Sequence, residues 1–162
     1  GIARAFGMTV IGFDPFISKE DLAKQQITKK EKLEEIMKSS DIISLHIPHN
    51  ENTHYIIDKS MLSHMKTSAF LINCARGGTV DESALYDALK NDEIAGAALD
   101  VFENEPPKDN KLKTLDNIVF SPHLGANTKE GQIRAGTICA EQVMKVLKDE
   151  TPDYWVNKAH MK

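Results

Sequence analysis

The sequence is poor in cysteine and has no long apolar run. Its two cysteines, Cys74 and Cys139, lie far apart and form no Cys-x-x-Cys pair, which argues against a disulfide framework and against a zinc site. Each apolar stretch is much shorter than the roughly 18 residues that a membrane-spanning helix needs. We therefore predict a cytoplasmic protein that binds no metal and has no membrane partner.

An excess of positive charge is also absent. The 162 residues include 20 Lys and Arg against 24 Asp and Glu, which gives a formal net charge of −4. The lysines stand among acidic neighbours, so no basic face is available to neutralise a phosphate backbone, and we expect no nucleic-acid partner. The length is that of one ordinary domain with a single core.

Short apolar runs alternate with helical segments along the chain. The runs cover residues 8–13, 41–47, 69–74, 94–99 and 118–120, and stretches within them such as 10–11, 42–43 and 70–72 are continuously apolar. Continuous runs are typical of parallel strands that helices cover on both faces. The pattern predicts an α/β fold, a Rossmann-like doubly wound parallel sheet that is buried between flanking helices.

Helix signals lie between these runs. Asp58 and Asp81 are predicted N-caps, and the longest helix is expected from Thr128 to about Lys148. The charged run at 24–32 is expected to be a solvated helix face. The helix after Asp81 should bury a stripe formed by Ala84, Leu85, Ala88 and Leu89.

Polar residues able to do chemistry follow nearly every apolar run. They are Asp14, His46, Arg76, Asp100 and His123. Because the carboxyl ends of parallel strands lie along one edge of a sheet, we expect these side chains to converge on one site.

Asp14 ends an early strand. A carboxylate there can accept hydrogen bonds from the ribose hydroxyls of a dinucleotide and would repel a 2′-phosphate, which favours NAD over NADP. Alternatively, Asp14 starts a turn, as Asp-Pro often does.

Arg76 and His123 are the candidate chemical groups. Arg76 precedes two glycines, so its guanidinium can grip the carboxylate of a small acid; alternatively, it is a surface arginine in a glycine turn. His123 can exchange a hydroxyl proton near neutral pH, and Glu105 can fix its tautomer; alternatively, His123 is structural. Cys74 is expected to pack inside a buried strand rather than to act as a nucleophile.

Four ordered motifs, at residues 12–15, 71–78, 96–102 and 122–126, make the sequence similar to the D-isomer-specific 2-hydroxyacid dehydrogenases. The resemblance covers nearly the whole chain, and residues 127–132 are most similar to the phosphoglycerate dehydrogenase branch of that family. It implies NAD-dependent oxidation of a D-2-hydroxy acid, with 3-phospho-D-glycerate as the expected substrate. It also implies a homodimer formed through the NAD-binding domain.

The resemblance assigns roles to individual residues. Arg76 would bind the substrate carboxylate, His123 would be the acid/base, and Glu105 would orient His123. The implied cofactor-binding positions are Asp14, Ile47, Pro48, Cys74, Ala75, Arg76, Asp100, His123, Leu124, Gly125 and Ala126.

The sequence also departs from the family. The Gly-x-Gly-x-x-Gly turn that should precede the short helix at residues 2–6 is absent, together with the first strand. We therefore expect residues 1–150 to be an NAD-binding domain truncated at its N-terminus, and 151–162 to be a tail leading toward a missing substrate domain. Such a piece is expected to bind NAD weakly and to turn over little.

Three alternatives stay open at this point. One is another 2-hydroxyacid dehydrogenase, such as a glyoxylate or hydroxypyruvate reductase. The second is a non-enzymatic, NADH-sensing relative of the corepressor type, because the same fold serves both roles. The third is an inert folded fragment.

Overall fold

The computed structural model describes residues 1–156, so residues 157–162 of the predicted tail lie outside the described residues. The chain divides between Pro122 and His123 into two compact units. The first unit contains both sheets, and the second contains one long helix.

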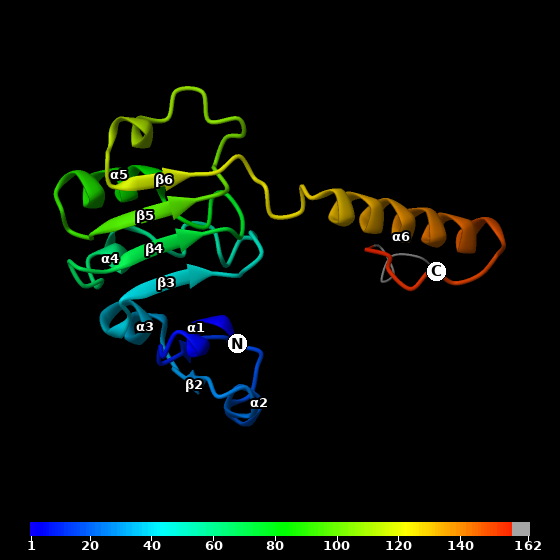
Figure 1. Ribbon diagram of the computed structural model, residues 1–162, viewed down its shortest axis with the longest axis horizontal. Helices are drawn as coiled ribbons and strands as arrows, with labels where there is room; N and C mark the ends of the chain where they lie inside the picture. The colour runs from blue at the N-terminus through cyan, green and yellow to red at the C-terminus, as the bar shows by residue number, and fades with distance from the viewer. Residues whose placement is uncertain (157–162) are drawn as a thin grey trace. The chain divides into compact units, whose positions relative to one another are not determined.

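Four neighbouring strands form the central sheet of the first unit. They are β3 (Ile42–Leu45), β4 (Phe70–Asn73), β5 (Gly96–Leu99) and β6 (Ile118–Phe120). Their order is β3-β4-β5-β6, and all three pairings are parallel (Figure 1). This confirms the predicted parallel sheet, with each strand inside its predicted run.

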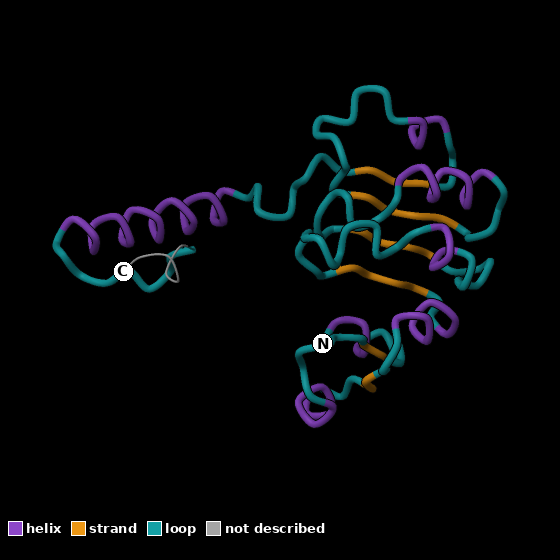
Figure 2. Tube along the Cα trace, turned by 180° about the vertical axis from the view of Figure 1, so that it is seen from behind, coloured by secondary structure: helices purple, strands orange, loops and turns teal. Residues whose placement is uncertain are grey.

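Helices pack on one face of this sheet (Figure 2). They are α3 (Leu33–Ser39), α4 (Lys59–Leu62) and α5 (Glu82–Lys90), with the 3-10 turn η1 (Lys111–Thr114) beside α5. Both predicted N-caps are confirmed, because Asp58 accepts the N–H of Met61 and Asp81 accepts those of Ser83 and Ala84. The predicted stripe of α5 is fully buried against the sheet.

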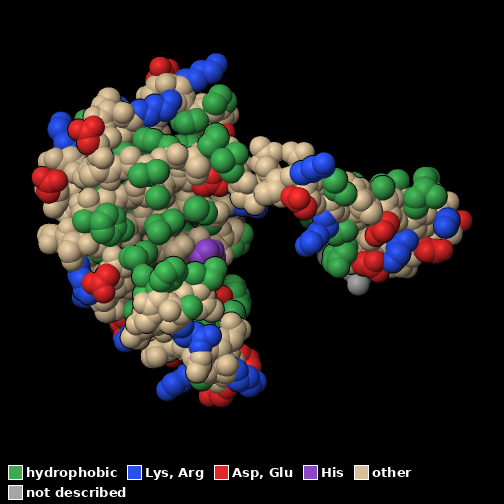
Figure 3. Space-filling view, viewed as in Figure 1, with side chains coloured by type: hydrophobic (Ala, Val, Ile, Leu, Met, Phe, Trp, Pro, Cys, Tyr) green, Lys and Arg blue, Asp and Glu red, His purple; other side chains and the backbone are tan. Residues whose placement is uncertain are grey.

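The other face of the central sheet is partly uncovered, which corrects the expectation of burial on both faces. Ile42 and Phe70 are about half exposed, and Val119 is 70% exposed. Figure 3 shows apolar side chains spread over the face that the strands present. Burial therefore alternates along β3, as it does in a sheet that is packed on one side only.

The start of the chain forms a second, smaller sheet. Its strands β1 (Ile11–Gly12) and β2 (Thr28–Lys29) pair in parallel with each other and with no strand of the central sheet. They are flanked by α1 (Ile2–Ala5) and α2 (Lys19–Lys24).

The expectation of a helix face at residues 24–32 is wrong. The helix α2 ends at Lys24, and Gln26 has a φ of +60°, where the chain turns toward β2. The N–H of Thr28 bonds to Val10 O and that of Lys30 bonds to Gly12 O, so the segment gains its partners from β1.

The second unit is built on α6 (Lys129–Leu147), which confirms the predicted long helix. Thr128 is its N-cap, and its hydroxyl accepts the Gly131 N–H. The segment that follows folds back onto α6, where the Asp153 carboxylate contacts Lys145 Nζ at 2.6 Å and the Asp153 N–H donates to Gln142 Oε1. Within residues 1–156, no helix has the length and apolar character that crossing a bilayer requires.

Candidate functional site

The carboxyl ends of the four central strands form a level row. Leu45 pairs with Asn73, Asn73 with Leu99, and Leu99 with Phe120. The residues that come next on these strands, His46, Cys74, Asp100 and Ser121, therefore emerge along one edge. This is the edge at which the sequence predicts a site.

Asp100 is the buried carboxylate of this edge, with a side chain only 6% exposed. Its Oδ1 accepts a 2.6 Å hydrogen bond from the Ser121 hydroxyl, and its N–H donates to Asn73 O. The charge-assisted bond from Ser121 offsets part of the cost of burying the carboxylate. Ser121 is not among the predicted site residues, although it directly follows an apolar run, which is the signal that indicates Asp100.

Asn73 shapes the loop that carries Arg76. Its buried amide donates to Arg76 O and to Thr79 Oγ1, and its Oδ1 accepts the Ala75 N–H. The Thr79 hydroxyl also donates to Arg76 O. Sequence reasoning missed this scaffold, yet an Asn at a strand end is a typical source of such local side-chain-to-backbone bonds.

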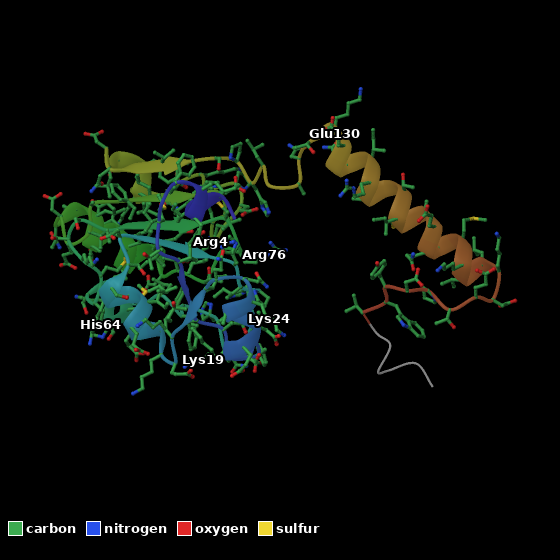
Figure 4. All side chains as sticks on the ribbon, turned by 60° about the horizontal axis from the view of Figure 1, so that its bottom comes forward. Arg4, Lys19, Lys24, His64, Arg76 and Glu130 are labelled. Carbon is green, nitrogen blue, oxygen red and sulfur yellow. The ribbon has the colours of Figure 1, made fainter. Side chains whose placement is uncertain are left out.

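The Arg76 side chain itself is exposed, and its Nη1 donates to Ala75 O at 2.6 Å. Figure 4 shows Arg76 at the border of the first unit, pointing out of the fold. A rigid loop thus presents an accessible guanidinium, which suits recognition of an anion.

The glycine after Arg76 permits a close backbone approach. A Cβ at Gly77 would overlap the carbonyl of Phe102 and would come within 3.0 Å of Glu103 N. The loop after β4 therefore lies directly against the segment after β5, and only glycine fits between them.

Three further predicted cofactor positions lie on the same edge. Ile47 and Pro48 follow β3 and are partly to fully accessible, and Cys74 follows β4. Cys74 is exposed, which corrects its interpretation as a buried packing residue: β4 ends at Asn73, so the thiol lies beyond the covered part of the strand. Ala75 is buried at the same turn.

Asp14 lies at the end of the smaller sheet. Its Oδ1 accepts the N–H groups of Phe16 and Ile17, at 2.8 Å and 3.2 Å. It therefore does form the Asx turn that the sequence offered as an alternative, and its Oδ2 takes neither of these bonds. The same carboxylate can therefore stabilise the turn through Oδ1 and accept a hydrogen bond from a ribose hydroxyl through Oδ2.

Glu105 is exposed and lies in the segment after β5, where its Oε1 accepts the N–H of Phe102 at 3.1 Å. His123 to Ala126 open the second unit and are all exposed. His123 has a φ of +53°, and the Asn127 N–H closes the turn by donating to Leu124 O.

A pair of carboxylates lies between α5 and the segment after β5. Glu82 and Glu103 each accept the other's backbone N–H. Burial raises the pKa of Glu82, and the nearby charge of Glu103 raises it further, while the hydrogen bonds from the Glu103 N–H and Asn110 oppose the shift. The pKa of Tyr55 is raised by burial and by its hydrogen bond to Glu103.

Within residues 1–156, the titratable side chains form no group of three or more that could hold a metal ion. The groups at the edge instead offer a guanidinium, carboxylates and backbone N–H donors. Such a set suits an organic ligand that carries its own anionic and hydroxyl groups.

The sequence matches a known family over most of its length. The family described as D-isomer specific 2-hydroxyacid dehydrogenase, NAD binding domain, matches residues 1–125. These residues include the smaller sheet, the central sheet and His123.

Curated relatives and solved structures agree with this match. The chain is 50% identical over 96% of its length to D-3-phosphoglycerate dehydrogenase of Methanocaldococcus jannaschii, of which it covers 30%. It is 43% identical over 90% of its length to hydroxypyruvate reductase of Thermotoga maritima and covers 47% of that protein. An NAD complex of a D-isomer specific 2-hydroxyacid dehydrogenase from Lactobacillus delbrueckii ssp. bulgaricus superimposes with a TM-score of 0.86 at 34% identity, over 96% of this chain and 51% of that one. The chain thus spans about half or less of each.

Proposed function

Because the chain belongs to the D-isomer specific 2-hydroxyacid dehydrogenase family, we propose that the protein containing it oxidises 3-phospho-D-glycerate to 3-phosphohydroxypyruvate with NAD. The observation that carries this proposal is the Arg76 loop. Asn73 and Thr79 hold the backbone carbonyl of Arg76, and the loop presents an exposed guanidinium at the same edge of the sheet as buried Asp100. Identities of 44–50% to D-3-phosphoglycerate dehydrogenases support the choice of substrate.

Residues that follow strands of both sheets support NAD as the cofactor. Asp14 Oδ2 would accept from the adenosine ribose, while Ile47 and Pro48 would line the adenine side. Cys74 is exposed in the loop whose backbone would contact the nicotinamide. The nicotinamide would be held by the backbone of 74–76, by the Asp100 carboxylate, and by the loop His123, Leu124, Gly125 and Ala126.

In the proposed reaction, Arg76 binds the substrate carboxylate through two N–H donors and so fixes the orientation of C2. His123 accepts the proton of the C2 hydroxyl, and Glu105 stabilises the imidazolium that results. The bound cofactor supplies the hydride acceptor for C2. Asp100 carries a negative charge whose position Ser121 fixes.

Relatives named hydroxypyruvate reductase and glyoxylate reductase give the second candidate function, at 43% and 40% identity. Both candidate functions use the same site, and they differ in the preferred substrate and in the preferred direction of the reaction. Steady-state rates with 3-phospho-D-glycerate and NAD, compared with rates for hydroxypyruvate and glyoxylate with NADH, separate the two. Binding of NADH without turnover of any of these acids would contradict both and favour a sensing role.

We also propose a cytoplasmic homodimer. The two cysteines are free thiols, which supports a reducing compartment. Exposed apolar side chains such as Phe70 and Val119 would gain from burial against a second copy. Light scattering of the purified protein tests the dimer, and a concentration-independent monomer would contradict it.

A further inference from the structure

Two carboxylates outside the proposed substrate and cofactor contacts bind each other's backbone. The N–H of Glu82 donates to Glu103 Oε1 at 3.0 Å, and the N–H of Glu103 donates to Glu82 Oε1 at 2.7 Å. Asn110 Nδ2 donates to Glu82 Oε2 at 2.5 Å, and the Tyr55 hydroxyl donates to Glu103 Oε2 at 3.1 Å. Each of the four carboxylate oxygens therefore has a partner. We name this reciprocal pair the Glu82–Glu103 brace.

The brace joins segments that are far apart in the sequence. Glu82 is the first residue of α5, so Glu103 satisfies an N–H that the helix itself leaves without a partner. Asp81 satisfies the next two. Glu103 belongs to the segment after β5, and Tyr55 to the loop after β3. The brace therefore ties the start of α5 to the segment after β5 and to a third loop.

Bringing two carboxylates together has an electrostatic cost. Partial burial of Glu82 raises its pKa, and the nearby charge of Glu103 raises it further. A helix N-terminus offsets some of it, because its partial positive charge stabilises nearby anions. The two reciprocal hydrogen bonds keep the carboxylates together despite this cost, and they hold the backbone of both glutamates in a defined place.

The peptide bond between Phe102 and Glu103 lies at the centre of this arrangement. Its N–H donates a hydrogen bond to Glu82 Oε1. On another side it meets Gly77, where no Cβ would fit. The preceding N–H, that of Phe102, donates to Glu105 Oε1. This one peptide therefore contacts the loop that carries Arg76 and adjoins the segment that carries Glu105.

We propose that Glu82 and Glu103 are positioning residues of the enzyme. By fixing the peptide between Phe102 and Glu103, the brace sets where the Arg76 loop and Glu105 stand at the strand edge. The inference rests on the proposed roles of Arg76 and Glu105. Neither Glu82 nor Glu103 touches the substrate or the cofactor in this scheme.

The test compares three variants of the protein that contains this chain. Glu103→Ala removes the acceptor of the Glu82 N–H and leaves that N–H without its partner. Glu103→Gln keeps an amide oxygen for that N–H and an amide group that can bond the Tyr55 hydroxyl. Asp87→Ala is the matched control, because Asp87 is an exposed acid on the same helix.

Glu103→Ala should lower kcat/KM for 3-phospho-D-glycerate by about 10- to 100-fold, the cost of a misplaced orienting group. The Kd for NAD should change by less than about twofold, since the proposed contacts with the adenosine half lie elsewhere. Glu103→Gln should restore most of kcat/KM, and Asp87→Ala should leave it unchanged. If Glu103→Ala lowers Tm but leaves kcat/KM unchanged, the proposal is overturned. Glu103 would then only stabilise the N-terminus of α5.

Amide hydrogen exchange gives a second readout that does not depend on activity. The proposal predicts that Glu103→Ala speeds exchange in peptides spanning 76–78 and 101–105, while the strand segment 42–45 keeps the wild-type rate. Unaltered exchange at 76–78 would overturn the inference. If the wild-type protein oxidises no hydroxy acid, the proposed function fails, and this exchange pattern alone decides whether the brace positions the loop.

Discussion

The Asp100 carboxylate accepts a 2.6 Å hydrogen bond from the Ser121 hydroxyl, across the carboxyl ends of β5 and β6. This bond joins two strand ends that are 21 residues apart in sequence. It fixes the position of the Asp100 side chain on the edge where the Arg76 loop also emerges.

Replacing Ser121 by Ala should destabilise the first unit. The buried Asp100 carboxylate would lose a charge-assisted bond, at a cost of about 1–3 kcal/mol in the free energy of unfolding. Urea-induced unfolding measures the change. Ser68→Ala, at an exposed turn, is the matched control and should be neutral. Equal stability of the two variants would show that the Ser121 bond contributes nothing to folding.

The stability of the chain should depend on the ionisation of Glu82. Because its pKa is raised above 4.5 in the folded state, the folded state binds this proton more tightly than the unfolded state does. The group's contribution is therefore fully present below pH 4.5 and is lost as the pH rises through the folded-state pKa. Unfolding free energies measured from acid to neutral pH should show the wild type losing stability relative to Glu82→Gln. A difference that is constant with pH would contradict this assignment.

The contact between Asp153 and Lys145 should respond to pH in the opposite sense. Hydrogen bonds from Lys145 and then Gln142 lower the pKa of Asp153 below 3.8. The contact is therefore complete above pH 3.8 and should be lost as the pH falls through the lowered value. Amide chemical shifts of Asp153 and Tyr154 report this transition by NMR. Asp153→Asn should release the segment at neutral pH, and shifts identical to wild type would contradict the role of the charge.

Replacing His123 by Ala should reduce turnover far more than cofactor affinity. Loss of a general acid/base group lowers kcat by about 10²- to 10⁴-fold. Rates with 3-phospho-D-glycerate, together with fluorescence titration of NADH, measure the two effects. His64→Ala is a suitable control, since Figure 4 shows His64 well separated from Arg76. Parallel losses of turnover and NADH affinity would mean that His123 is structural.

The parts of the fold that follow local rules could be predicted from the sequence. Asp58 and Asp81 cap their helices, as is typical of short polar side chains that precede an apolar stripe, and every central strand lies inside one of the predicted runs. The row of polar residues at the strand ends follows from parallel pairing, and register then aligns Cys74, Asp100 and Ser121.

Other features depend on contacts that the sequence does not encode locally. The strand β2 has two residues, too few to show any periodicity, and its partners come from β1. The exposure of Phe70 and Val119 depends on which face of the sheet the helices cover. Both residues are as apolar as their buried neighbours, so the residue type alone does not predict which of them is exposed. The reciprocal bonds of Glu82 and Glu103 link positions 21 residues apart, and no spacing rule relates the two.

The central claim is that Arg76 binds the carboxylate of a D-2-hydroxy acid that NAD oxidises. Its most direct test is the initial rate of NADH formation against 3-phospho-D-glycerate concentration, for the wild type and for Arg76→Lys, with Arg134→Lys as control. The account predicts that Arg76→Lys loses about 10- to 100-fold in kcat/KM, because an ammonium cannot make the bidentate contact. The KM for NAD and the control should stay at wild-type values. A wild-type rate of zero, or an Arg76→Lys variant as efficient as the wild type, would contradict the claim.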